Sequence, residues 1–353
     1  MFSLSVFHNK KGPDFDIVLY KKNNKVINCI DFYNDDLITG NSDGTLTLYN
    51  IKTGKEIREY NNKNQGNNNS ISYCKIFNNK IISGCFDGKI YIWEIKGSLV
   101  KILNEHKKQI SKIIIDKQNG IFMSSSYDLT IRIWNINSNY SIGKLIDIHK
   151  YPITNFNWIN SFCFSSDKNG NIAFWDINTQ NCFSNCKLHK GEITNIIFYE
   201  DIITKKNNLI ITSGYDGFIN VINLNNLKII YSKCIYNGCI SFISLTINNF
   251  LITTGEKLIK IFDIQKNFIQ IGEMKSTDKI FKADIFGSIL ITGCVDGNIL
   301  CYNIDLMECI WGYCCVKKGG IKFCNIIKEK NKIIAIGENN QGKVFLISSL
   351  LLF

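Results

Sequence analysis

The stretch "NIAFWDINTQN", residues 171–181, contains the only Trp-Asp pair of the chain, Trp175-Asp176. Its first six letters recur as a pattern in which the second and fourth letters are apolar and the third varies freely. This period of two is typical of a strand with one buried face. The fifth letter is Trp, Tyr, Ile or Phe, and the sixth is Asp, Asn, Glu or Ser. The eight copies are TLTLYN (45–50), KIYIWE (89–94), TIRIWN (130–135), NIAFWD (171–176), FINVIN (218–223), LIKIFD (258–263), NILCYN (298–303) and KVFLIS (343–348).

The spacing of the copies indicates a repeat architecture, because successive copies end 40–47 residues apart, at 50, 94, 135, 176, 223, 263, 303 and 348. A strand-like run precedes each copy and a more polar one follows it. An Asp-Gly pair between two alternating apolar runs is a strong signal for a tight hairpin. The sequence therefore predicts units of four antiparallel strands, with the most apolar strand innermost and the most polar outermost. Asp-Gly precedes four copies, at Asp43-Gly44, Asp87-Gly88, Asp216-Gly217 and Asp296-Gly297.

With these features the chain resembles a WD40-repeat β-propeller over residues 15–353. The resemblance implies a hydrogen-bonded His–Ser/Thr–Asp–Trp set that makes a blade rigid, and the third unit has all four residues. Other units match in part, and units six and eight match least. The complete set is His106, Ser124, Asp128 and Trp134; the fourth unit offers His149, Ser165 and Trp175 with Asn169 where Asp is expected; the fifth offers His189, Thr212 and Asp216 with Ile222 in place of Trp; and the second offers Ser83, Asp87 and Trp93 without His.

The predicted fold class is all-β: one closed WD40-type propeller over residues 1–353, with eight blades of four antiparallel strands. Residues 15–21, "FDIVLYK", are expected to close the ring as the outermost strand of the last blade. Seven blades is the alternative, with the eighth or sixth unit as an appendage. Two surface expansions are expected, a low-complexity Asn-rich loop at 61–69 and an enlarged loop at 199–208.

Composition favours an intracellular protein, in the cytoplasm, the nucleus or both. No apolar run approaches the roughly 18 residues that span a bilayer, and the N-terminal stretch lacks the features of a secretory signal. The fourteen cysteines lack zinc-ligand spacing, and several, such as Cys85 and Cys294, lie in apolar runs typical of buried structural thiols. We therefore expect no metal, no cofactor and no membrane insertion.

The formal charge of +11 could indicate a nucleic-acid partner, but only Arg58 and Arg132 are arginine and the other basic residues are lysine. Nucleic-acid readers usually depend on arginine for bidentate contacts. A solvated basic surface is therefore favoured, and an RNA- or ribonucleoprotein-associated propeller is kept as the alternative.

Two motif-like stretches carry no chemistry. "GENNQGKV" (337–344) has the glycines and lysine of a P-loop, but Val344 stands where Ser or Thr should bind Mg²⁺ and a strand follows instead of a helix. "DKNGN" (167–171) lacks the later glycine and glutamate of a calcium loop, so it is predicted to be a turn. The serine, histidine and aspartate residues named above are expected to form hydrogen bonds with one another that stabilise the blades, and not to act as a hydrolase triad. The sequence predicts a protein that is not an enzyme and has no small-molecule substrate.

The remaining candidate for function is one face of the propeller, which is predicted to bind other proteins as a scaffold or adaptor within a multiprotein complex. The positions before the turn aspartates, together with the loops that contain the histidines, place aromatic residues among lysines there, as in protein-binding hot spots. The predicted face comprises Phe86, Tyr127, Tyr215, Tyr151, Lys107, Lys108 and Lys190.

Overall fold

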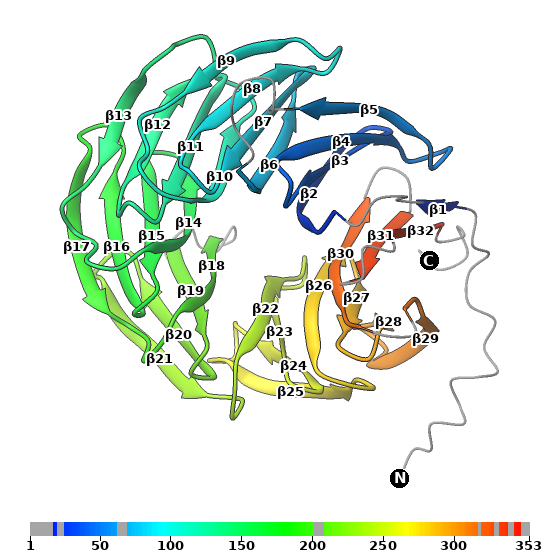
Figure 1. Ribbon diagram of the computed structural model, residues 1–353. Coiled ribbons are helices and arrows are strands. Elements are labelled where there is room, and N and C mark those ends of the chain that lie inside the picture. The colour runs from blue at the N-terminus through cyan, green and yellow to red at the C-terminus, as the bar shows by residue number, and fades with distance from the viewer. Residues whose placement is uncertain are drawn as a thin grey trace. The chain divides into compact units, whose positions relative to one another are not determined.

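The computed structural model describes residues 17–19, 25–61, 69–200, 208–316, 319–327, 332–337 and 342–346. Within these ranges the chain contains strands β1 to β32 and no helix, and it forms eight four-stranded antiparallel sheets (Figure 1). The predicted all-β class and the eight-unit count are confirmed. The sheets fall into two compact units, one of five sheets and one of three.

The five-sheet unit contains β2 to β21, and each of its sheets follows chain order from the first strand to the fourth. The first sheet is β2 (Ile27–Tyr33), β3 (Asp36–Asn41), β4 (Thr45–Asn50) and β5 (Glu56–Asn61). The second is β6 (Ile71–Phe77), β7 (Lys80–Cys85), β8 (Ile90–Glu94) and β9 (Leu99–Leu103), and the third is β10 (Ile110–Asp116), β11 (Ile121–Ser126), β12 (Ile131–Asn135) and β13 (Ser141–Leu145). The fourth is β14 (Ile153–Ile159), β15 (Phe162–Asp167), β16 (Asn171–Asp176) and β17 (Asn181–Lys187), and the fifth is β18 (Ile193–Glu200), β19 (Asn208–Gly214), β20 (Phe218–Asn223) and β21 (Lys228–Cys234).

The three-sheet unit contains the rest of the strands. The sixth sheet is β22 (Ile240–Leu245), β23 (Phe250–Gly255), β24 (Leu258–Asp263) and β25 (Ile269–Lys275). The seventh is β26 (Ile280–Phe286), β27 (Ile289–Cys294), β28 (Asn298–Asn303) and β29 (Glu308–Cys314). The eighth is β30 (Ile321–Ile327), β31 (Lys332–Gly337), β32 (Gly342–Leu346) and β1 (Ile17–Leu19).

The fourth strand of the eighth sheet comes from the N-terminal part of the chain. β1 pairs antiparallel with β32, with Ile17 opposite Val344 and Leu19 opposite Gly342. This is the outer position predicted for the segment 15–21, although only its central three residues are described. The two predicted surface loops lie almost wholly outside the described residues, at 62–68 and 201–207.

The quoted copies form the third strand of each sheet, and burial is greatest in the second and third strands. In the third sheet, β11 is buried from Phe122 to Ser126, because neighbouring strands and neighbouring sheets cover it on all sides. The first strands pack against one another within each unit and are only half-buried. Burial does not test the prediction that the innermost strand is the most apolar, which stays a prediction. The prediction that the outermost strand is the most polar fits the largely exposed strands β17 and β21.

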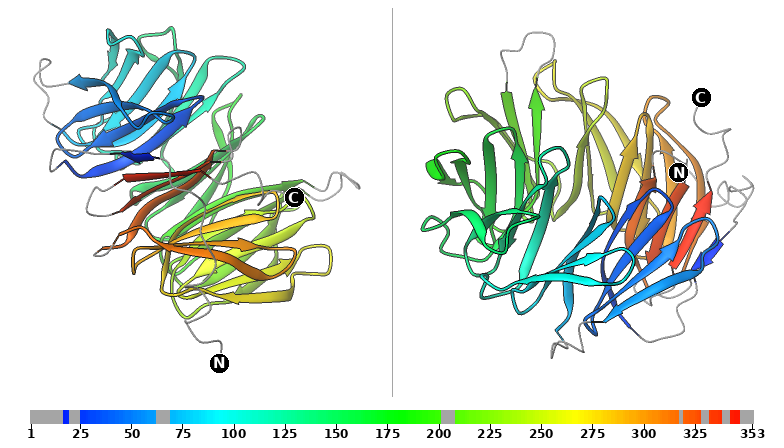
Figure 2. Two further views of the ribbon diagram at one scale, coloured as in Figure 1. Left: turned by 90° about the vertical axis from the view of Figure 1, so that its right-hand side faces the viewer. Right: turned by 90° about the horizontal axis from the view of Figure 1, so that it is seen from above.

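The hydrophobic core lies between neighbouring sheets. One cluster joins the second and third sheets through Ile92, Phe122 and Trp134, and another joins the third and fourth through Met123 and Trp175. Figure 2 shows the twist that lets successive sheets pack face to face within a unit. Every first strand begins with a buried isoleucine and has a register shift directly after it, for example between Ile110 and Lys112. Such bulges turn the start of the strand and aim the preceding loop.

Candidate binding face

The third sheet brings together the four residues predicted as a hydrogen-bonded set. His106 lies four residues before β10, and its Nδ1 atom is 2.9 Å from Asp128 Oδ2. Its Nε2 atom is 2.8 Å from Ser124 Oγ, which also accepts a 2.8 Å hydrogen bond from Trp134 Nε1. The set thus joins the loop before β10, the second strand, the third strand and the turn between them.

The fourth sheet has an equivalent set, but its carboxylate comes from a different position than the one predicted. His149 Nδ1 is 3.1 Å from Asp167 Oδ2, and His149 Nε2 is 2.7 Å from Ser165 Oγ. Trp175 Nε1 donates to the same Ser165 oxygen at 2.8 Å. Asp167, the fully buried last residue of β15, reaches the histidine from two positions earlier than Asn169. The inference that this unit lacks its aspartate is therefore wrong.

In the fifth sheet an asparagine stands near the histidine in place of the missing tryptophan. His189 Nδ1 is 2.9 Å from Asp216 Oδ1, and its Nε2 is 2.9 Å from Thr212 Oγ1. Asn220 Nδ2 lies 3.1 Å from the same His189 Nε2. Burial lowers the pKa of His189 below its usual value, although Asp216 acts in the opposite direction.

In the other sheets different groups take the place of the histidine. In the sixth sheet Tyr236, four residues before β22, places its hydroxyl 3.1 Å from Thr253 Oγ1. In the first sheet Lys25 Nζ lies 3.0 Å from Asp43 Oδ2. In the second sheet Trp93 Nε1 has no hydrogen-bond partner among the described residues. Counting four residues back from the first-strand isoleucine would have found Tyr236 in the sequence.

The predicted binding residues all lie at one end of the five-sheet unit. They come from the turns between second and third strands and from the loops that lead into the first strands. Phe86, Tyr151 and Tyr215 are exposed, at 45%, 46% and 57% of their surface, whereas Tyr127 is half-buried. Lys107, Lys108 and Lys190 are exposed. We call these seven residues the turn face.

The carboxylates of the turns point into the protein, away from the turn face. Asp128 accepts hydrogen bonds from His106 and from the Lys107 backbone N–H, at 2.9 Å each. Asp216 binds His189 and the Lys190 N–H in the same way. Burial alone would raise the pKa of both carboxyls, but hydrogen bonds from the histidine and the backbone lower each pKa below its usual value. The ionised carboxylates are therefore hydrogen-bonded on the inner side, while the lysine side chains remain outside.

Two further lysines belong to this surface, although the sequence analysis did not select them. Lys150 follows His149 as Lys107 follows His106, and it is exposed. Lys168 lies before the turn of the fourth sheet, at the position of Tyr127 and Tyr215, and is also exposed. The histidine at the start of each loop was the signal that would have located Lys150.

The described residues show no group of three or more His, Cys, Asp or Glu side chains placed to hold a metal ion. Within the same ranges, no helix is long and apolar enough to cross a membrane. All fourteen cysteines are free, and Cys85 and Cys294 are fully buried, as expected for structural thiols.

Solved structures with similar folds are β-propellers of the WD40 class. The structure superposes on Sqt1 from Saccharomyces cerevisiae with a TM-score of 0.81 and 15% identity, covering 96% of this chain and 100% of that one. For the C-terminal WD40 domain of Sif2 the TM-score is 0.80 at 16% identity, covering 96% and 99%. The computationally designed Ika8 protein gives 0.79 at 18% identity, covering 92% and 97%. The fold is thus that of a WD40 β-propeller.

The sequence comparisons agree with the fold. The family described as "WD domain, G-beta repeat" matches residues 97–135, the stretch that contains His106, Ser124, Asp128 and Trp134. Autophagy-related protein 16 of Arabidopsis thaliana is 23% identical over 142 residues, 40% of this chain and 27% of that protein. Nuclear distribution protein nudF of Aspergillus niger is 26% identical over 98 residues, 26% of this chain and 22% of that protein. The matches span less than a third of these relatives. They show one WD40 repeat at residues 97–135 within a chain whose fold is that of a WD40 propeller.

Proposed function

We propose that this protein is a non-enzymatic interaction scaffold or adaptor that binds a partner protein through the turn face. WD40 propellers are generally scaffolds of this kind, and the histidine sets here satisfy their own hydrogen bonds. One observation carries the proposal. The turn carboxylates bind histidines and backbone N–H groups inside the protein, while aromatic rings of the turns and lysines of the neighbouring loops are exposed.

Aromatic side chains supply most of the binding energy at many protein interfaces, and surrounding charges set orientation and encounter rate. Phe86, Tyr151 and Tyr215 come from three sheets and offer such anchors. The lysines around them suit a partner surface that carries carboxylates. No single one of these residues is expected to account for binding alone.

The test is a comparison of co-purified partners between the wild-type protein and two variants. The first variant reverses Lys107, Lys108 and Lys190 to Glu, and the second changes Phe86, Tyr151 and Tyr215 to Ala. All six side chains are exposed, so both variants should retain the wild-type unfolding temperature. We expect each variant to lose a principal partner that the wild type retains.

A matched control reverses three exposed lysines at the opposite end of the five-sheet unit, Lys96, Lys117 and Lys228. This control keeps the change in net charge but should retain every partner. If both turn-face variants keep all partners, or if the control loses the same ones, the proposal is wrong.

The RNA-associated alternative has support only from the lysines. Arg132 is bound to Glu105 and to Ser141 Oγ, so one of the two guanidinium groups of the chain is engaged within the protein. If the principal co-purified partner were RNA, its binding should weaken steeply as salt is raised, because neutralising phosphates releases counterions. Partners lost on nuclease treatment would favour this alternative over the scaffold.

A further inference from the structure

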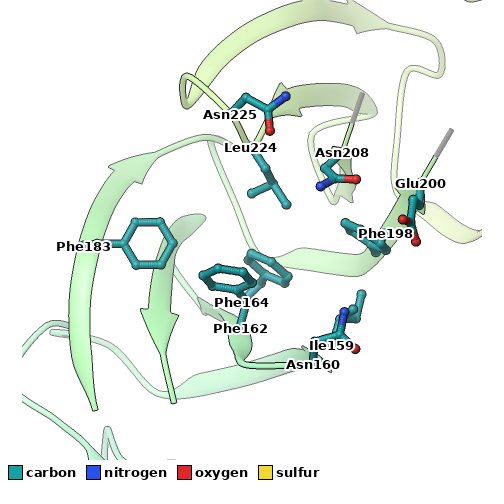
Figure 3. A pocket seen from close by; sticks show the side chains of 10 residues that line it. All are labelled: Ile159, Asn160, Phe162, Phe164, Phe183, Phe198, Glu200, Asn208, Leu224 and Asn225. Carbon is teal, nitrogen blue, oxygen red and sulfur yellow. The ribbon is translucent and has the colours of Figure 1, made fainter. Parts of the chain in front are cut away.

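A cavity of about 240 Å³ lies between the fourth and fifth sheets, at the opposite end of the five-sheet unit from the turn face. It is bounded by the turn that joins β14 to β15, by the outer strand β17, and by the facing ends of β18 and β19. Figure 3 shows its wall, in which Phe162, Phe164, Phe183 and Phe198 surround an open space and Leu224 lies across from them. Nothing in the proposed function uses this cavity.

Two of the phenylalanine rings that line the cavity are exposed to solvent, although they lie next to each other. Phe162 and Phe183 are 43% and 46% exposed, and their ring centroids are 5.9 Å apart. Phe183 also lies 6.2 Å from Phe174, and Phe164 belongs to the core cluster beneath. The cavity is thus an opening into the hydrophobic layer between the two sheets. Covering these rings would remove further apolar area from water, which favours a ligand with an apolar group.

The neighbouring junction has a different aromatic residue at the position of Phe198. Five residues after the first isoleucine, β14 has Trp158, which packs against the core between the third and fourth sheets. The same position of β18 has Phe198. Phe198 forms part of the cavity wall at the junction of the fourth and fifth sheets.

Two oxygen acceptors at the cavity could receive hydrogen bonds or an ion pair from a ligand. Glu200 is exposed at the rim and forms no ion pair with any described residue. Asn208 Oδ1 is buried and has no hydrogen-bond partner within the described ranges. A buried carbonyl-type oxygen without a donor is unfavourable, so a ligand that supplies an N–H group would stabilise it.

From these features we propose that the cavity binds one bulky apolar side chain of a partner protein, with a lysine or arginine beside it in the partner's sequence. The volume is below the roughly 300–1,000 Å³ of pockets for drug-sized ligands, which suits a single side chain. The apolar side chain enters among the phenylalanines, the basic residue pairs with Glu200, and a backbone N–H reaches Asn208 Oδ1.

The strand that carries Phe183 favours a peptide over a free small molecule. β17 is the last strand of its sheet order, so among the described strands its outer edge has no neighbour. An edge strand presents alternating backbone donors and acceptors that an extended peptide can pair with. A peptide lying there would have its side chains within reach of the cavity.

The test uses capped five-residue peptides with 4-fluorophenylalanine in the middle and fluorine NMR of its ring. One peptide has lysine on both sides of the ring, and its counterpart has glutamate on both sides. The lysine peptide should bind the wild-type protein and the glutamate peptide should bind more weakly. Phe183→Ala should weaken the lysine peptide about tenfold, since it removes the outer ring of the wall. Glu200→Gln should weaken it about two- to fivefold, the range of an exposed ion pair.

Tyr140→Ala is the matched control, because Tyr140 is 75% exposed in the third sheet and does not line the cavity. It should leave peptide binding unchanged, and all three variants should unfold at the wild-type temperature. The proposal fails if the two peptides bind equally, if neither binds, or if Phe183→Ala and Glu200→Gln have no effect. It also fails if binding requires replacement of residues 201–207 by a Gly-Ser linker, since the occupant would then be the chain itself.

Discussion

The third and sixth sheets use different side chains to fix the loop before the first strand. Both hold the loop before the first strand against the second strand, through a residue four positions before the first isoleucine. In the third sheet this residue is His106, which bonds to Ser124 on one side and to the turn carboxylate of Asp128 on the other. In the sixth it is Tyr236, whose hydroxyl lies 3.0 Å from the Thr253 carbonyl oxygen and whose ring lies under Lys260.

The difference shows what a histidine adds. Its two ring nitrogens connect two partners at once, so the third sheet fixes the loop and the turn together and brings a carboxylate inside. Tyr236 has a single hydroxyl, and its interactions reach the second and third strands without a turn carboxylate. The histidine-bearing sheets of the five-sheet unit therefore present well-defined turns whose carboxylates are hydrogen-bonded to the histidines. This is the property on which the proposed binding face depends.

The largest effect should come from His106→Ala. The change leaves Asp128 and Ser124 without their shared partner in a buried site, and we expect a loss of about 3 kcal/mol in the free energy of unfolding. Thermal and denaturant unfolding would measure it, with Tyr140→Ala as an exposed reference that should change little. A loss no larger than that of the reference would mean that the histidine set does not stabilise the third sheet.

A second comparison, between Asp167→Asn and Asn169→Asp, tests the position of the carboxylate in the fourth sheet. Asp167 receives hydrogen bonds from His149 and from the Asn171 side chain, so its loss should cost about 2 kcal/mol. Asn169→Asp creates the residue that the repeat pattern expects, yet it should not increase stability. An increase in unfolding temperature in Asn169→Asp would instead favour the register inferred from the sequence.

Tyr236→Phe should have a smaller effect, about 1 kcal/mol, because it removes one neutral hydroxyl and keeps the ring. The ratio between this loss and that of His106→Ala, measured under the same conditions, tests whether the two sheets differ as described. Equal losses would remove the distinction between a histidine that binds a turn carboxylate and a tyrosine that binds the strands through one hydroxyl.

The smallest effect concerns pH and the fifth sheet. Burial lowers the pKa of His189 below its ordinary value of 6.5, so the folded protein binds fewer protons there than the unfolded chain. The stability from this group is present above pH 6.5 and decreases as the pH falls toward the folded-state pKa. His189→Gln should flatten the pH dependence of the unfolding temperature in this range. An unchanged slope in the variant would assign the dependence to other groups.

Most of the fold was readable from the sequence because the period-two pattern and the Asp-Gly turns recur at nearly constant spacing. TIRIWN and its seven counterparts became third strands, and even "KVFLIS" contributed β32 in spite of its P-loop-like prefix. The burial of the strands was not readable in the same way, because apolar content alone does not show that β11 and β12 are covered on both faces while β10 is not.

The sites were less predictable, since they depend on which side chain reaches a shared point in space. His106, Ser124, Asp128 and Trp134 follow the pattern of the repeat and were found. Asp167 was missed because a carboxylate two positions earlier can reach the same histidine from the end of a buried strand. The cavity beside Phe183 was missed as well, because it depends on packing between strands that belong to different sheets.

The pairing of β1 with β32 has a consequence for the order of events during synthesis. Leu19 emerges from the ribosome early, whereas its partner Gly342 emerges more than three hundred residues later. The eighth sheet therefore cannot be completed until β32 has been made, although the sheets built from consecutive strands can form as they emerge. Until then β1 has no partner strand. A factor that binds the nascent chain at the ribosome would have to keep this strand from pairing with other chains.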